Sequence, residues 1–360
     1  MRHRSKLWTL AAFLLAFTGT LSAQEYFGRN KPSYESFNFD VYRSPNFEIY
    51  SYLKNADRRK DLADFAELWY RYHQNLLTDT FATTNPLIFY NDHADFQQTN
   101  TISGGVGVGT GGVTEAFKNR VIMPIALTNQ ATYQVLGHEL VHAFQFNRIL
   151  NGDSTSIQNL GNLPLWVVEG MAEYMSTGSV DPHTAMWMRD AVLNDDVPTL
   201  DQLNNPKYFP YRYGHAFWSF LTGLKTDMVI EPFFKAVAIY GVDAAVPMVL
   251  GMSKKDFSKL WQDAITAQFK PSIAGKEKNT YGKPILDDKD GGQMNISPSI
   301  SPDGKYVLFT SERNLFSTDI FLADATNGQI MKTVASTARG GNVDFFDFLE
   351  SSGAWSPDSK

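Results

Sequence analysis

The sequence QVLGHELVHAFQF spans residues 134–146 and contains the pattern His-Glu-x-x-His, formed by His138, Glu139 and His142. Residues four apart lie on one face of an α-helix, so both imidazoles can bind one ion at roughly 2.0–2.1 Å if the stretch is helical. The pattern predicts a zinc site in which Glu139 acts as general base on a zinc-bound water. The alternative is a buried helix with two hydrogen-bonded histidines.

The flanks of this stretch favour a helix. Thr128 and Asn129 are cap-type residues, and no proline occurs between Ala131 and Leu150. Gly137 costs about 1 kcal/mol of helix propensity relative to alanine. Such a glycine beside a metal site is tolerable if another backbone segment approaches there.

A catalytic zinc ion needs a third protein ligand, and two carboxylates are candidates. Glu169 and Glu173 follow in LWVVEGMAEY, residues 165–174, with 26 residues between His142 and Glu169. The two are four apart and share a helical face. One can bind zinc, while the other accepts the free N–H of a ligand histidine. A solvated acidic face is the alternative, although the neighbouring residues leave little of this helix polar.

The two motifs together resemble the gluzincin zinc peptidases, most closely the aminopeptidase and leukotriene-hydrolase group. The resemblance covers roughly residues 47–269 and implies His138, His142 and Glu169 as zinc ligands and Glu139 as the base. The ligand spacing is longer than is usual in those aminopeptidases, and Val168 replaces their asparagine. The chain therefore resembles a divergent branch. Because an open coordination position is needed for hydrolysis, we expect Glu173 to contact a ligand histidine and not the metal.

The resemblance extends to the stretch YRYGHAF at residues 211–217. In the aminopeptidases a tyrosine at the matching position, Tyr211, stabilises the tetrahedral intermediate, and a phenol donor suits a developing oxyanion. Tyr213 and a packing role for Tyr211 remain alternatives, and His215 is a weaker donor candidate. The aminopeptidase segment that holds a substrate amino terminus is not matched, so endo- and exopeptidase action both stay open.

The resemblance also implies the fold class. We expect an α+β zincin-like peptidase domain with a mixed-sheet lobe and a helical lobe, followed by the start of an all-β propeller. Strands are predicted near residues 47–52, 87–90 and 120–125, and a helix over residues 56–77. The glycine-rich residues 104–112 lead into the last strand. In gluzincins an edge strand here binds substrate backbone, which predicts a cleft rim; a plain hairpin is the alternative.

Length and composition restrict the class of protein. The 360 residues suggest two domains or more, and 43% hydrophobic with 19% charged residues is globular. A net charge of −6 gives no reason to expect a nucleic-acid partner. There is no cysteine, which excludes disulfides, thiolate zinc sites and cysteine nucleophiles.

Residues 1–23 are typical of a secretory signal. The basic residues Arg2, Arg4 and Lys6 precede an apolar run to Leu21, and Ala23 is a small residue at the expected cleavage point. The alternative, a membrane anchor, needs a longer apolar run. We expect cleavage before Gln24, a periplasmic or secreted protein, and no stable membrane insertion.

The C-terminal part has a different character. A polar linker at residues 273–284 precedes ISPDGK at 300–305, and WSPDSK at 355–360 repeats that pattern 55 residues later. Residues 285–360 resemble the TolB-like propeller repeats, as one blade and the start of the next. We expect the chain to be the front of a longer protein or a truncated form, with the propeller ligand unknown.

The sequence therefore predicts an exported zinc peptidase, residues 24–272, that hydrolyses peptide or protein substrates. Two alternatives remain. One is an inactive peptidase-like binding or scaffold protein, against which the complete set of four site residues argues. The other is a zinc hydrolase for a non-peptide substrate such as an epoxide.

Overall fold

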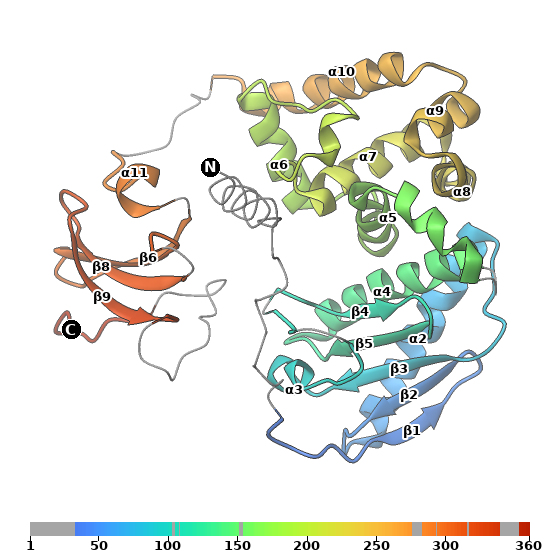
Figure 1. Cartoon of the computed structure of the whole chain (residues 1–360), viewed down its shortest axis with the longest axis horizontal. Helices are drawn as coiled ribbons and strands as arrows, with labels where there is room; N and C mark the ends of the chain where they lie inside the picture. Colours follow the sequence, from blue (N-terminus) through green and yellow to red (C-terminus); the bar gives the residue numbers. More distant parts are fainter. Residues whose placement is uncertain are drawn as a thin grey trace, which may run out of the picture. The chain divides into compact units, whose positions relative to one another are not determined.

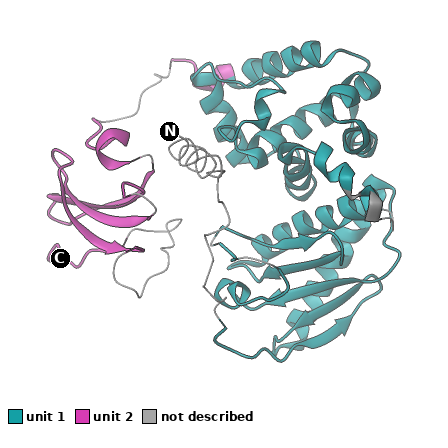
Figure 2. Cartoon of the chain, viewed as in Figure 1, with its two compact units in different colours: residues 1–269 teal, residues 270–360 magenta. Residues whose placement is uncertain are grey.

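The computed structural model describes residues 33–102, 105–107, 109–150, 154–275, 283–292, 294–314, 317–338 and 353–360. Contacts divide the chain into two units, residues 1–269 and residues 270–360 (Figure 2). The expected signal at residues 1–23 lies outside the described residues, and so do residues 276–282 of the expected linker. Within the part that the structure describes, no helix combines the length and the apolar character needed to cross a bilayer.

The first unit begins with a mixed five-stranded sheet (Figure 1). Its order is β1-β2-β3-β5-β4; β2, β3 and β5 run parallel, and β1 and β4 pair antiparallel at the two edges. In β2 alternate residues are buried, which is the pattern of a strand with one face on the core. The strands are β1 (Asp40–Arg43), β2 (Phe47–Ser51), β3 (Asn85–Tyr90), β4 (Val113–Glu115) and β5 (Arg120–Pro124).

Two long helices pack against each other beside this sheet, α2 (Ala56–Leu77) and α4 (Asn129–Leu150). The predicted helix over residues 56–77 is confirmed, and the Asn55 side chain caps it. Thr128 Oγ1 accepts from the Ala131 N–H at 3.1 Å and so caps α4. At Gly137 the close neighbour is the side chain of Trp69 and not a backbone segment: a Cβ there would lie 2.7 Å from Trp69 Cζ2.

The rest of the first unit is helical. Helices α5 and α7 cross so closely that a Cβ on Gly170 would lie 2.6 Å from the backbone oxygen of Gly214. This close crossing needs glycine on both helices. The lobe consists of α5 (Leu165–Thr177), α6 (Pro182–Leu193), α7 (Pro210–Lys225), α8 (Ile230–Tyr240), α9 (Val242–Leu250) and α10 (Lys254–Ile273).

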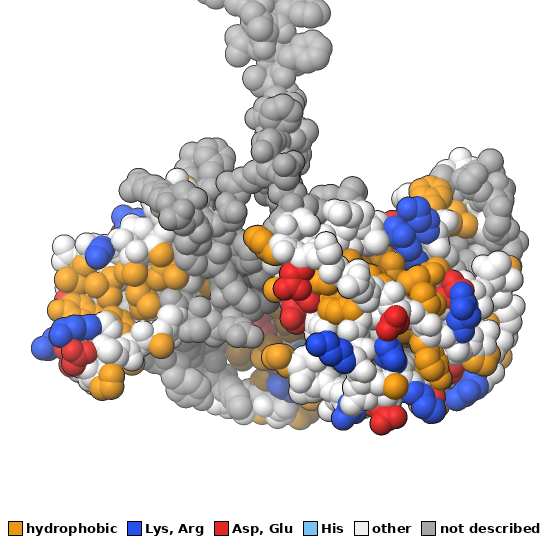
Figure 3. All heavy atoms as spheres, turned by 90° about the horizontal axis from the view of Figure 1, so that it is seen from below, with side chains coloured by type: hydrophobic (Ala, Val, Ile, Leu, Met, Phe, Trp, Pro, Cys, Tyr) orange, Lys and Arg blue, Asp and Glu red, His pale blue; other side chains and the backbone are white. Residues whose placement is uncertain are grey.

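Short elements connect these parts. The helix α3 (His93–Gln97) follows β3, and 3₁₀ turns occur at Ser154–Asn162, Gln202–Asn204 and Asp227–Val229. On the face seen in Figure 3, acidic and basic side chains lie interspersed over the first unit. Mixed charges of this kind are typical of an ordinary solvated surface.

The second unit contains one antiparallel four-stranded sheet in the order β6-β7-β8-β9. Its elements are α11 (Asp288–Gly291), β6 (Asn295–Ile300), β7 (Tyr306–Ser311), β8 (Asp319–Asp324) and β9 (Ile330–Ser336). Gly328, with φ of 75°, takes the left-handed turn position before β9. The described strands form an open sheet and no closed ring. The second repeat lies against the first, since Trp355 Nε1 donates to Ser299 O at 3.1 Å.

Candidate metal centre

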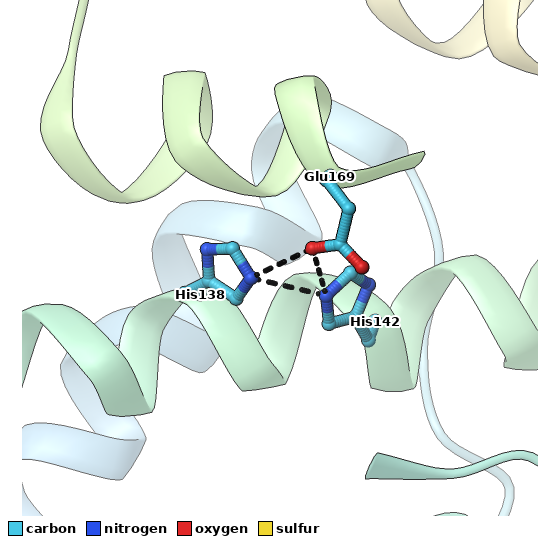
Figure 4. A group of neighbouring side chains, drawn as sticks. All are labelled: His138, His142 and Glu169. Carbon is cyan, nitrogen blue, oxygen red and sulfur yellow. Dashed lines mark hydrogen bonds and ion pairs between the residues drawn. The ribbon is translucent and has the colours of Figure 1, made fainter. Parts of the chain in front are cut away.

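Two histidines from α4 and one carboxylate from α5 converge in the first unit (Figure 4). The Nε2 atoms of His138 and His142 lie 3.1 Å apart, and Glu169 Oε2 lies 3.2 Å from the first and 3.3 Å from the second. Ligands of a tetrahedral ion with bonds of 2.0–2.1 Å are separated by roughly 3.3 Å. Within the part of the chain that the structure describes, these three residues form a group that could hold a metal ion.

The outer nitrogens of both histidines have partners that determine the tautomers. His138 Nδ1 lies 3.3 Å from Glu173 Oε1, and His142 Nδ1 lies 2.8 Å from Gln145 Oε1. The Gln145 amide cannot be reversed, because its Nε2 donates to Val168 O at 3.0 Å. Each Nδ1 therefore carries the hydrogen, as in protein metal sites where the second nitrogen of a ligand histidine is hydrogen-bonded.

This arrangement leaves lone pairs directed at one point. In these tautomers both Nε2 atoms are acceptors, and so is the carboxylate of Glu169, so none can donate to the others. Burial alone would lower the pKa of His138, but the carboxylates of Glu169 and Glu173 outweigh burial and raise that pKa, because a protonated ring could donate to both. Burial would raise the pKa of Glu169, yet the two facing histidines lower it, because once protonated they could donate to its carboxylate. The cluster thus favours positive charge, and the donor set of two imidazoles and a carboxylate fits zinc.

Glu173 is held on both sides. While Oε1 faces His138, Oε2 accepts from Arg212 Nη1 at 3.0 Å, and the same nitrogen lies 3.1 Å from Asp181 Oδ2. Burial would raise the pKa of Glu173, but the bond with His138 and the charge of Arg212 lower it. Both oxygens of Glu173 are therefore engaged, and Glu173 is not part of the group of three residues that could hold a metal ion.

Glu139 lies beside the cluster and is 6% exposed. Thr114 Oγ1, on β4, donates to Glu139 Oε2 at 2.7 Å. A Cβ on Gly112 would lie 2.8 Å from Glu139 Cγ, so a larger residue there would displace the Glu139 side chain. The glycine-bearing stretch expected at the cleft rim therefore contacts the helix that carries the two histidines.

The structure separates the two tyrosine candidates. The ring of Tyr211 lies parallel to that of His138, with centroids 5.9 Å apart. Burial and the nearby Glu169 carboxylate raise the pKa of Tyr211, so its hydroxyl keeps its hydrogen. Tyr213 instead packs against Trp187 and Tyr208. His215 is also away from the cluster, with Nε2 2.7 Å from Gly178 O.

Three residues of the site were missed by sequence reasoning. Gln145 follows His142 by three residues, so helical spacing could have indicated it. Arg212 adjoins Tyr211 in the sequence but contacts Glu173 only because α5 and α7 cross. Thr114 gave no local signal, because its contact depends on how β4 passes α4.

Comparison with protein families bears on these residues. The model of the family "BSP: Peptidase of plants and bacteria" matches residues 55–263, which include the whole cluster and its hydrogen-bond partners. The chain belongs to this peptidase family. A comparison with curated proteins found no match. The matched residues include α2, the strands β3, β4 and β5, and the helical lobe as far as residue 263. The assignment to a peptidase family therefore concerns the first unit.

Proposed function

We propose that the chain is an exported zinc-dependent peptidase of the gluzincin type, with His138, His142 and Glu169 as the ligands. The observation that carries the proposal is the convergence of three lone-pair donors within 3.3 Å, with both histidine tautomers fixed from outside. Membership of a peptidase family supports it. A zinc ion bound there would polarise water and the scissile carbonyl and stabilise the developing oxyanion.

The remaining steps belong to side chains of the protein. Glu139 accepts a proton from the attacking water and later gives it to the leaving amine. Thr114 holds one oxygen of Glu139, which orients the carboxylate for this transfer. Tyr211 donates a hydrogen bond from its hydroxyl to the oxyanion, and its raised pKa keeps that hydroxyl protonated.

The same reasoning gives a proposal for the rest of the chain. Residues 1–23 are the secretory signal, 24–272 the peptidase domain, 273–284 a linker and 285–360 TolB-like propeller repeats. The sheet of the second unit exposes Ile300, Met331 and Val334 at 63%, 55% and 49%, and Figure 3 shows hydrophobic side chains gathered on this unit. A neighbouring blade would cover such a surface.

The test combines metal analysis with digestion of a generic peptide by the purified full chain. We expect one zinc per chain, its near-complete loss in His142→Ala, and retention in the matched control His183→Ala, whose side chain is exposed. Glu139→Gln should keep zinc and lose about 10²–10⁴-fold or more in turnover. Full zinc occupancy in His142→Ala, or wild-type turnover in Glu139→Gln, would refute the proposal.

A further inference from the structure

A row of aromatic rings leads away from the candidate metal centre. Tyr211 stacks on His138, with ring centroids 5.9 Å and planes 12° apart. Phe209 stacks on Tyr211 at 5.2 Å and 27°, and Trp187 of α6 lies against Phe209 at 5.8 Å and 31°. We call Tyr211, Phe209 and Trp187 the aromatic row. Phe209 is 42% exposed and the other two rings are half-buried, so the row reaches solvent.

Phe209 occupies a position where an aromatic residue has no local advantage. It is the N-cap of α7, and its side chain makes no cap hydrogen bond. Helix N-caps favour Ser, Thr, Asp and Asn, whose side chains accept from the free backbone N–H groups. At the start of α6 in the same lobe, Asp181 does this by accepting from the Thr184 N–H at 2.6 Å. Departures from a local rule, such as the one at Phe209, are concentrated at functional sites.

The row lies within reach of a peptide bound at the metal centre. The ring of Phe209 is two steps, of 5.2 Å and 5.9 Å, from the ring of His138. An extended peptide advances about 3.3 Å per residue, so two such steps correspond to at most about three residues. A substrate with its scissile carbonyl beside the Tyr211 hydroxyl therefore has a side chain that can meet Phe209.

The charges beside the row do not call for a charged substrate side chain. Lys207 Nζ lies 2.6 Å from Asp196 Oδ2, and Arg212 Nη1 lies 3.0 Å from Glu173 Oε2. Each of these cations therefore already has an acidic partner. What the row offers is ring surface, and a ring that packs on another ring gains more than its buried area alone provides.

We propose that the aromatic row is a substrate subsite, which receives an aromatic side chain within about three residues of the scissile bond. The subsite rests on the proposed peptidase function, since it defines which peptides the metal centre would cleave. Phe209 is its central residue, because it is the most exposed ring of the row and contacts both of the others.

The experiment uses peptides of alanine and serine with free ends, in which one phenylalanine is moved along the chain residue by residue. Mass spectrometry of the products locates the cut bond relative to the phenylalanine. At one position within about three residues of the cut, phenylalanine should raise kcat/KM about 10-fold or more over alanine. Leucine at that position should be about 2–10-fold poorer than phenylalanine, because it fills space but cannot pack ring on ring.

Variants of Phe209 test whether this ring is responsible. Phe209→Ser removes the ring and supplies the missing helix cap, so a lost preference is not explained by a weakened helix. The ratio of kcat/KM for the phenylalanine and leucine peptides should then fall to about one. Phe209→Trp keeps an aromatic ring and should keep the preference. Tyr240→Ser, which removes a 57% exposed ring at the end of α8, is the matched control and should keep it too.

A binding measurement separates the subsite from the peptidase proposal. Calorimetry compares the affinities of the same peptides for the full chain carrying Glu139→Gln, with and without Phe209→Ser. If the wild-type chain cleaves none of the peptides, the peptidase proposal fails, yet tighter binding of the phenylalanine peptide that Phe209→Ser abolishes still supports the subsite. If phenylalanine improves neither cleavage nor affinity over leucine, or if the preference survives Phe209→Ser, the subsite is refuted.

Discussion

The crossing of α5 and α7 offers the sharpest test of how the fold positions the metal centre. The perturbation is Gly170→Ala, one residue after the proposed ligand Glu169. The new methyl group would lie 2.6 Å from Gly214 O and closer still to the carbonyl carbon and Cα of that glycine. All three are backbone atoms of α7, so no side-chain rotation can relieve the contact.

The magnitude follows from these distances. Carbon contacts are normally about 3.5–4.0 Å, so the two helices must separate by about 1 Å. Overpacking costs about 1–3 kcal/mol, and a clash between backbones belongs near the upper end. Alanine recovers about 1 kcal/mol of helix propensity. We expect a net loss of about 2 kcal/mol in the free energy of unfolding. Because metal bonds tolerate errors of only about 0.2 Å, a displaced Glu169 should weaken zinc by at least about 10-fold.

The assay measures urea unfolding of the metal-free protein and zinc affinity by competition with a chelator. Gly223→Ala is the matched control, because it lies on α7 and a Cβ there meets nothing within 4 Å. That variant should gain up to about 1 kcal/mol and bind zinc normally. If Gly170→Ala is as stable as Gly223→Ala and binds zinc equally well, the inferred contact does not determine the site.

Three further outcomes are expected. Glu169→Gln should weaken zinc binding far more than Glu173→Gln, since only the first removes a proposed ligand; the second should cost about 10–100-fold. Arg212→Met should lower the free energy of unfolding by about 3 kcal/mol, because it leaves Glu173 and Asp181 as buried carboxylates without their shared cation. Burial lowers the pKa of His73 to about 4 from 6.5. At pH values between about 4 and 6.5, the histidine is therefore protonated in the unfolded chain but neutral in the folded chain. The free energy of unfolding should fall by about 3 kcal/mol as the pH falls from about 6.5 to about 4.

Each of these outcomes has a control. Equal zinc dissociation constants for Glu169→Gln and Glu173→Gln would contradict the ligand assignment. Arg71→Met, an exposed arginine on α2, should leave stability unchanged, and an equal loss there would remove the case for Arg212. His73→Gln keeps a donor for Gly137 O but does not titrate, so its stability should depend less on pH in the metal-free protein. The same dependence in both proteins would show that His73 is not responsible.

Periodic segments were predictable from the sequence because their signal is local. The helix over residues 56–77 has the predicted bounds, since apolar residues recur at helical spacing and Asn55 can cap it. The short edge strands β1 and β4 and the helix α9 were not predicted. Strands of three or four residues carry too little alternation to be recognised, and they form only against a partner. Helix α9 is largely apolar and contains Pro247, so it lacks the usual pattern.

In the candidate metal centre, too, some features follow from local spacing and others only from the tertiary structure. Spacing alone places His138 beside His142, and Glu169 on one face with Glu173, because four residues make about one helical turn. Which carboxylate faces the histidines, which histidine Glu173 contacts, and whether Tyr211 or Tyr213 lies near them depend on how α4, α5 and α7 cross. Those crossings are set by packing between residues far apart in the chain, such as Gly170 against Gly214, and no local pattern encodes the resulting directions.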